Sequence, residues 1–311
     1  MKNILVLGGA GYIGSVFVES LLNKNYKVTV VDNFFYSQNS LNHLCNNDNL
    51  DIINLDVKNI SELKKILKNF DFIFPLAAYV GAPLCNKDPI GAKLINYNSI
   101  IDLLNIISKD QILIMPTTNS AYGSGNKDNY CDENTKLKPI SKYAIDKVEI
   151  EKKVMSRKNS ISLRLATVFG MSSRMRLDLL VNDFVYRAVT DKFIVLFESH
   201  FTRNYIHVRD VSNVFIHSME NYDKMKGEIY NVGLSNANLT KFELCKKIKS
   251  FIPDFVILEE KIKKDEDQRN YIVSNKKIEN TGFVPEFSIE DGIQELIKGY
   301  KYLKKTGHSN V

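Results

Sequence analysis

The 311-residue sequence lacks features that would assign it to several other classes of protein. Its four cysteines show no C-x-x-C spacing and no paired histidine, so we expect reduced thiols, no disulfide framework and no metal site. No apolar run approaches the length that crosses a membrane. The net charge of +6 is modest and the basic residues are scattered, which argues against nucleic-acid binding. We therefore expect a cytoplasmic protein.

What the chain does contain, at its start, is a strand, a glycine-rich turn, a helix and a second strand. The short run Ile4 to Leu7 is rich in branched side chains and predicts a buried strand. The amphipathic stretch Tyr12 to Asn23 predicts a helix, and Lys27 to Val31 predicts the next strand. Glycines in such a turn allow a tight bend and the approach of a pyrophosphate to the helix N-terminus. The turn carries Gly8, Gly11 and Gly14 in a G-x-x-G-x-x-G spacing.

The second strand ends on an acidic residue, Asp32. A carboxylate at this point, roughly twenty residues after the glycines, binds the two ribose hydroxyls of an adenosine. It also repels a 2′-phosphate, and no arginine or lysine follows it at positions 33–36. The sequence therefore predicts a bound dinucleotide, and NAD rather than NADP.

Strand-like and helix-like segments alternate through the first half of the chain. This alternation predicts an α/β fold, a Rossmann-type doubly wound parallel sheet with a smaller C-terminal substrate-binding lobe. We expect residues 1–170, with a returning segment at about 203–222, to form the NAD-binding domain. The lobe is expected at about 171–202 and 223–305, and a tail at 306–311. The other expected strands are 51–55, 70–76, 111–116 and 160–165, and the expected helices are 61–69, 89–107, 141–155, 177–190 and 288–303.

Ligands in such sheets lie at the carboxyl ends of the strands. After the third strand, Asp56 and Val57 suit the edge of an adenine. After the fourth come small residues against which a flat cofactor can lie, although tight packing alone also accounts for them. Asn96, on the next helix, is within reach of the cofactor site or is an exposed helical residue.

A Y-x-x-x-K pattern, Tyr143 to Lys147, begins a later helix. The i,i+4 spacing places the phenol and the ammonium on the same face of that helix. A cation beside a phenol lowers the pKa of the tyrosine, which can then act as a general base toward a sugar hydroxyl. Thr118, after the fifth strand, is expected to hydrogen-bond the same hydroxyl.

Together these residues resemble the extended short-chain dehydrogenase/reductase family, in its NAD-dependent nucleotide-sugar epimerase/dehydratase branch. The chain departs from the pattern at Pro75, where a histidine is usual, and at Thr167, where an asparagine is common. The resemblance implies tightly bound NAD held by Gly8, Gly11, Tyr12, Ile13, Gly14, Asp32, Asn33, Asp56, Val57, Leu76, Ala77, Ala78, Tyr79, Asn96, Tyr143 and Lys147. It implies a nucleotide-diphosphate sugar bound by Val80, Gly81, Thr118, Asn119, Ser120, Thr167, Arg174, Asn182, Arg203 and Arg269. Guanidinium forks suit phosphate oxygens, although surface ion pairs are the alternative for the last two.

The resemblance also narrows the chemistry. The 4,6-dehydratases of this family carry Asp-Glu directly after the catalytic Thr, whereas this chain has Asn119 and Ser120 there. Neither transfers a proton near neutral pH, so we expect oxidation at C4, ending in epimerisation or in release of the ketone. A 4,6-dehydratase and a non-catalytic NAD-binding regulator are the alternatives, and the presence of both Tyr143 and Lys147 argues against the regulator.

Two segments, Val80 to Cys85 and Arg174 to Asp178, resemble a subgroup of capsule-cluster enzymes that includes the GDP-manno-heptose 4-dehydrogenases. For such an enzyme a 2-keto acid is a possible acceptor of the hydride. The helices at 89–107 and 141–155 resemble the pair with which family members form a four-helix homodimer interface. A homodimer is therefore expected.

Overall fold

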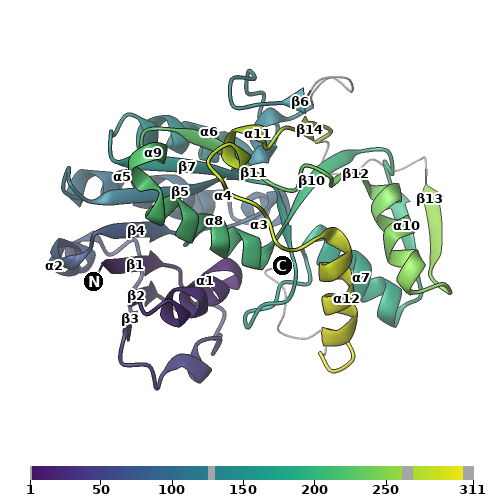
Figure 1. The fold of residues 1–311 in the computed structure, drawn as a ribbon, viewed down its shortest axis with the longest axis horizontal. Helices are drawn as coiled ribbons and strands as arrows, with labels where there is room; N and C mark the ends of the chain where they lie inside the picture. Colours follow the sequence, from purple (N-terminus) through teal and green to yellow (C-terminus); the bar gives the residue numbers. More distant parts are fainter. Residues whose placement is uncertain (1, 125–129, 261–268, 304–311) are drawn as a thin grey trace.

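The computed structural model describes residues 2–124, 130–260 and 269–303. Its centre is a seven-stranded, wholly parallel sheet in the order β11-β7-β5-β4-β1-β2-β3 (Figure 1). The predicted α/β class is thereby confirmed, and the strand order reverses between β1 and β4, where such sheets bind ligands. The strands are β1 (Asn3–Leu7), β2 (Lys27–Asp32), β3 (Leu50–Asn54), β4 (Phe72–Pro75), β5 (Ile112–Thr118), β7 (Ser160–Leu165) and β11 (Ile229–Val232).

Both faces of the sheet are buried, because alternate residues of each strand point to opposite sides. In β1, Ile4 and Val6 enter one hydrophobic cluster, whereas Leu5 and Leu7 enter another. Helices α1 (Tyr12–Asn23) and α8 (Val208–Glu220) pack together on the first face (Figure 1). Helices α2 (Ile60–Ile66), α5 (Ser99–Ile106) and α6 (Lys142–Met155) contribute to the second.

A smaller lobe packs beside the carboxyl ends of the strands (Figure 1). Its hydrophobic core joins residues from well-separated parts of the chain. The lobe comprises α7 (Leu180–Thr190), α10 (Lys241–Phe251), α12 (Ile289–Gly299) and a two-stranded parallel sheet of β9 (Phe193–Phe197) and β13 (Val256–Glu260). A three-stranded sheet of β8 (Thr167–Phe169), β10 (Thr202–His207) and β12 (Asn238–Thr240) lies between lobe and main sheet.

The remaining elements are short. They are α3 (Ala82–Lys87), α4 (Pro89–Lys93), α9 (Tyr222–Met225), α11 (Lys276–Glu279), the paired strands β6 (Tyr130–Cys131) and β14 (Ile272–Val273), the 3₁₀ turns η1 (Asn42–Leu44), η2 (Leu67–Asn69) and η4 (Asn119–Tyr122), and the π-helical turn η3 (Leu94–Asn98). Within the described ranges, no helix combines the length and apolar character that a membrane crossing requires.

Two sequence-based expectations are corrected. The single helix expected over 89–107 consists of α4, the π-helical turn η3 and α5, a local insertion that the apolar period does not reveal. The lobe was expected to resume at residue 223, yet β11 pairs with β7 at the edge of the main sheet. The expected tail at 306–311 lies outside the described residues.

Candidate active site

The glycine-rich turn between β1 and α1 has no room for side chains. Gly8 has a φ of +85°, and a Cβ atom there would lie 2.5 Å from the backbone nitrogen of Ala77. A Cβ atom on Gly14 would lie 2.4 Å from the carbonyl oxygen of Gly8. Because Gly11 is the N-cap of α1, no side chain caps the N–H groups in the first turn of this helix. The turn therefore offers bare backbone N–H groups to an anion, as a dinucleotide pyrophosphate requires.

Asp32 ends β2 beside this turn and is buried. Its Oδ2 accepts a hydrogen bond from the backbone N–H of Ala10 at 3.0 Å, and its Oδ1 accepts bonds from the N–H of Phe34 and the side chain of Gln38. Burial raises the pKa of Asp32, and these hydrogen bonds oppose the rise. The carboxylate thus braces the glycine turn and still faces the cavity, which fits an adenosine ribose. Gln38 has no signal in the sequence pattern.

A cavity with a volume of about 630 Å³ runs from the glycine turn toward the smaller lobe. Most of the residues predicted to bind cofactor or substrate line it, although they come from both halves of the chain. They are Gly8, Gly11, Tyr12, Ile13, Gly14, Asp32, Asn33, Asp56, Val57, Leu76, Ala77, Ala78, Tyr79, Val80, Gly81, Thr118, Ser120, Tyr143, Lys147, Thr167, Arg174, Arg203 and Arg269.

Three predicted site residues do not line the cavity. Asn96 is buried in η3, where its amide bonds both the N–H and the C=O of Tyr79 at 2.8 Å. Asn182 is buried in α7 and bonds the backbone of Gly170 and Arg176, so it supports the loop between them. Asn119 is buried at the start of η4. The first two therefore hold backbone in place outside the lining of the cavity.

The three predicted catalytic residues converge on the middle of the cavity. Thr118 ends β5, and its hydroxyl donates to Oγ of Ser120 at 2.8 Å. Tyr143 lies in the first turn of α6, which Ser141 caps through the N–H of Ala144. Lys147 is buried, with its Nζ 6.0 Å from the centre of the Tyr143 ring. The i,i+4 geometry expected from the sequence is therefore present.

The pKa of Tyr143 departs from the expectation. Burial raises the pKa of Tyr143 to about 12, and the neighbouring Cys85 adds to the rise. Arg269 and Arg176 act in the opposite direction on the pKa of Tyr143. Burial also lowers the pKa of Lys147 to about 8, because little water reaches this wall of the cavity. Without ligands, the phenol is thus protonated at neutral pH.

Cationic side chains from the second half of the chain also line the cavity. The guanidinium of Arg269 donates to the Ser120 hydroxyl, and that of Arg203 donates to the carbonyl of Thr202 at 3.0 Å. Arg174 lies with its guanidinium carbon 4.8 Å from the centre of the Tyr36 ring. These three arginines come from separate segments, and together they suit the phosphates of a nucleotide.

Three further cations of the cavity, Lys58, Arg176 and Lys241, are absent from the predicted site. Arg176 forms an ion pair with Asp178, and both line the cavity. Its place in the same basic stretch as Arg174 is the signal that could have found it. Lys241 begins α10 and donates to the carbonyl of Phe197 at 3.0 Å. The sequence gives no sign that Lys241 belongs to the cavity, because β9 and α10 are far apart in the chain and meet only in the folded lobe.

The chain is similar to known proteins in both sequence and structure. The sequence profile of the NAD dependent epimerase/dehydratase family matches residues 4–233. A protein from Methanocaldococcus jannaschii described as a putative UDP-glucose 4-epimerase is 26% identical over 97% of this chain and 100% of its own. The structure of UDP-glucose 4-epimerase from Thermotoga maritima with UDP-glucose superposes with a TM-score of 0.83 at 25% identity, covering 96% of this chain and 99% of its own. That of dTDP-glucose 4,6-dehydratase from Bacillus anthracis in complex with NAD gives a TM-score of 0.83 at 25% identity, covering 97% of each chain.

Proposed function

The chain belongs to the NAD-dependent epimerase/dehydratase family, whose cofactor is NAD, and from that premise we propose that it oxidises the C4 hydroxyl of a nucleotide-diphosphate sugar. The observation that carries the proposal is the position of Thr118, Tyr143 and Lys147. They line the same cavity as the glycine turn, which suits NAD, and the arginines, which suit a diphosphate. A sugar that joins the two ends of the cavity passes these three side chains.

Each of the three has a distinct role. Tyr143 takes the proton of the C4 hydroxyl, and Thr118 orients that hydroxyl by a hydrogen bond. Lys147 places its ammonium 6.0 Å from the centre of the Tyr143 ring, and a positive charge there favours the phenolate form. When bound, NAD supplies the acceptor for the hydride and a positively charged ring. The apolar wall that raises the pKa of Tyr143 also keeps water from the oxidised carbon.

The residues after Thr118 support oxidation without dehydration. Family dehydratases place an acid pair there, whereas Ser120 lines the cavity and Asn119 is buried beside it. Neither side chain ionises near neutral pH. The products in keeping with these residues are a 4-epimer or a released 4-keto sugar. A 4,6-dehydratase is the second candidate, because the solved structures that resemble this chain include one.

We further propose a GDP-heptose or a related capsule sugar as the substrate. Support comes from the two segments that resemble the capsule-cluster subgroup, since both border the cavity, through Val80 and Gly81 in one and Arg174 and Arg176 in the other. A 2-keto acid is then the acceptor that regenerates NAD when the ketone is released.

A homodimer is part of the same proposal. The helices expected at its interface carry exposed apolar side chains, Ile90 on α4 and Ile145 on α6. Burying such side chains between two copies is favourable. Sedimentation as a monomer at micromolar concentration would contradict this assembly.

The test is the mass of the product. The protein is incubated with GDP- and UDP-linked hexoses and heptoses, with a 2-keto acid added, and Tyr143→Phe protein serves as the control. A product lighter by two hydrogens identifies a net 4-dehydrogenase, and an unchanged mass with altered chromatographic mobility identifies an epimerase. Loss of water identifies a dehydratase and refutes the role given to Asn119 and Ser120. No change with any sugar refutes the proposal and favours an NAD-binding regulator.

A further inference from the structure

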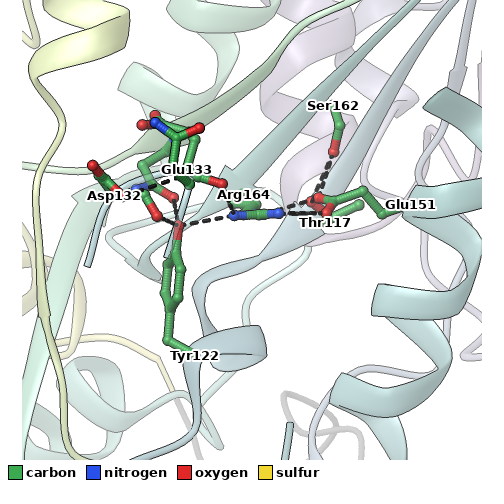
Figure 2. Close-up of polar contacts among 9 residues, drawn as sticks. Thr117, Tyr122, Asp132, Glu133, Glu151, Ser162 and Arg164 are labelled. Carbon is green, nitrogen blue, oxygen red and sulfur yellow. Dashed lines mark hydrogen bonds and ion pairs between the residues drawn. The ribbon is translucent and has the colours of Figure 1, made fainter. Parts of the chain in front are cut away.

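A buried charged cluster connects strand β5 with helix α6 (Figure 2). We call it the Glu151 cluster, and its members are Thr117, Tyr122, Glu151, Ser162 and Arg164. Arg164 binds both carboxylate oxygens of Glu151, at 2.7 Å through Nη2 and 3.0 Å through Nε. Both side chains of this ion pair are about 4% exposed. None of the five was predicted to belong to the site.

Glu151 ties the helix that carries the base to the strand that carries Thr118. It lies two turns after Tyr143 and one turn after Lys147 on α6, so the three share one face of the helix. Its Oε2 accepts a bond from Oγ1 of Thr117 at 2.9 Å, and Thr117 directly precedes Thr118 on β5. Within the described part of the chain, the hydrogen bond of Lys147 itself goes to the carbonyl of Pro116, at 3.5 Å. The short bonds between α6 and β5 at this level are therefore those of Glu151.

Arg164 extends the cluster to Tyr122, in the turn that follows Thr118. Figure 2 shows its guanidinium between Glu151 and the hydroxyl of Tyr122, to which Nη1 donates at 2.9 Å. Tyr122 ends η4, the turn that begins directly after Thr118. The Tyr122 ring packs edge-on against Tyr271, two residues after Arg269. One ion pair thus connects α6 with η4, the turn that packs against Tyr271.

Stability alone is a weak reason for such a pair. Desolvation of two charges offsets much of their attraction, and apolar side chains of similar volume often stabilise a core equally well. Apolar side chains, however, lack the directed hydrogen bonds that set distances between elements. We propose that Glu151 and Arg164 are positioning residues, which hold Thr118 in register with Tyr143 and Lys147. This inference rests on the proposed C4 oxidation.

The decisive variant replaces the ion pair by apolar side chains, Glu151→Leu together with Arg164→Met. The remaining hydroxyls keep partners, because Thr117 and Ser162 lie 3.0 Å apart and Tyr122 lies 2.7 Å from Oδ1 of Asn231. We expect a Tm close to that of the wild type, bound NAD and an unchanged KM for the nucleotide sugar. The kcat should fall by about a hundredfold, since a misplacement of about 1 Å has that effect. A double variant whose kcat and Tm both equal those of the wild type would overturn the proposal.

Two single variants keep the proposal testable if the double variant does not fold. Thr117→Val removes one tie and leaves Ser162 and Arg164 bound to the carboxylate, so kcat should fall with little change in Tm. Val154→Ala is the matched control, because Val154 is buried on the same helix in an apolar cluster. It should lower the Tm and leave kcat unchanged. An equal loss of kcat in Val154→Ala would mean that any weakening of α6 suffices, which refutes a positioning role.

A measurement without substrate separates this inference from the proposed function. The phenolate absorbance of Tyr143 is titrated in the NAD complex, as the difference between each protein and its Tyr143→Phe counterpart. The charged or titratable groups that face this phenol are Lys147, Cys85, Arg176 and Arg269. In the double variant we expect an apparent pKa for Tyr143 that differs from the wild-type value, because the distances from the phenol to these groups are no longer fixed. If the wild type turns over no sugar, the proposed function fails. Independently, a double variant that titrates at the same pH as the wild type refutes the positioning role.

Discussion

The two ends of the cavity are built in different ways. The cofactor end is formed largely by residues close together in the chain: Asp32 accepts the N–H of Ala10 in the glycine turn and that of Phe34, two residues after Asp32 itself. The arginines that suit the substrate, Arg174, Arg203 and Arg269, line the same cavity from three separate segments. Short-range structure leaves a spacing that can be recognised in the sequence, whereas long-range assembly leaves only scattered residues. The same contrast predicts separable effects of mutation at the two ends.

The largest effect is expected where the two ends meet. Tyr143→Phe keeps the ring in the wall of the cavity and removes the group that accepts the proton. Turnover should fall by about a thousandfold, the middle of the range for loss of a general base, while NAD stays bound. Rapid-mixing absorbance of the nicotinamide measures the rate. A near-normal rate would remove Tyr143 from the mechanism.

The second effect is on stability and depends on pH. Burial lowers the pKa of Lys147 from its ordinary 10.5 to about 8, so the unfolded chain holds a proton that the folded protein has lost between these values. Burying the charge therefore costs about 3 kcal/mol below pH 8, and this cost disappears as the pH rises to 10.5. Lys147→Met should be the more stable protein below pH 8, with the difference shrinking above it. Urea unfolding of both proteins across this pH range measures the difference, and a constant difference would contradict the buried charge.

At the cofactor end, Asp32→Ala removes the carboxylate that faces the cavity and accepts the N–H of Ala10. Hydrogen bonds to a charged group contribute about 1.5–3 kcal/mol, so the affinity for NAD should fall by about tenfold to a hundredfold. The affinity for nucleoside diphosphate should not change. Calorimetric titration of the NAD-free protein measures both. Asp51→Ala, which removes an exposed carboxylate from the neighbouring β3, is the control and should bind NAD normally.

At the substrate end, Arg269→Lys keeps the charge and loses the fork that can bind two phosphate oxygens at once. The KM for the nucleotide sugar should rise about tenfold, the equivalent of about 1.4 kcal/mol, with NAD affinity unchanged. Steady-state kinetics measure the effect. Arg187→Lys is the matched control, because this arginine forms an exposed ion pair on α7. Equal changes in the two variants would mean that the identity of the cation at the cavity is immaterial.

Local patterns predicted much of the fold and part of the site. Helix α1 and strand β7 have the predicted ends, because caps, glycines and apolar periodicity act within a few residues. The π-helical turn at 94–98 escaped this reasoning, since it changes the helical register without changing the residue types. The family resemblance assigned Asn182 to the substrate, and only the structure places its amide against the backbone of Gly170.

The sequence by itself determined the α/β class, the NAD-binding turn and the helical spacing of Tyr143 and Lys147, because each depends on residues near one another in the chain. Only the tertiary structure decided the raised pKa of Tyr143 and the gathering of the arginines. It also decided the burial of the Glu151 cluster, whose members come from β5, η4, α6 and β7. Burial and charge are properties of surroundings, and the surroundings of these groups come from segments far apart in the chain.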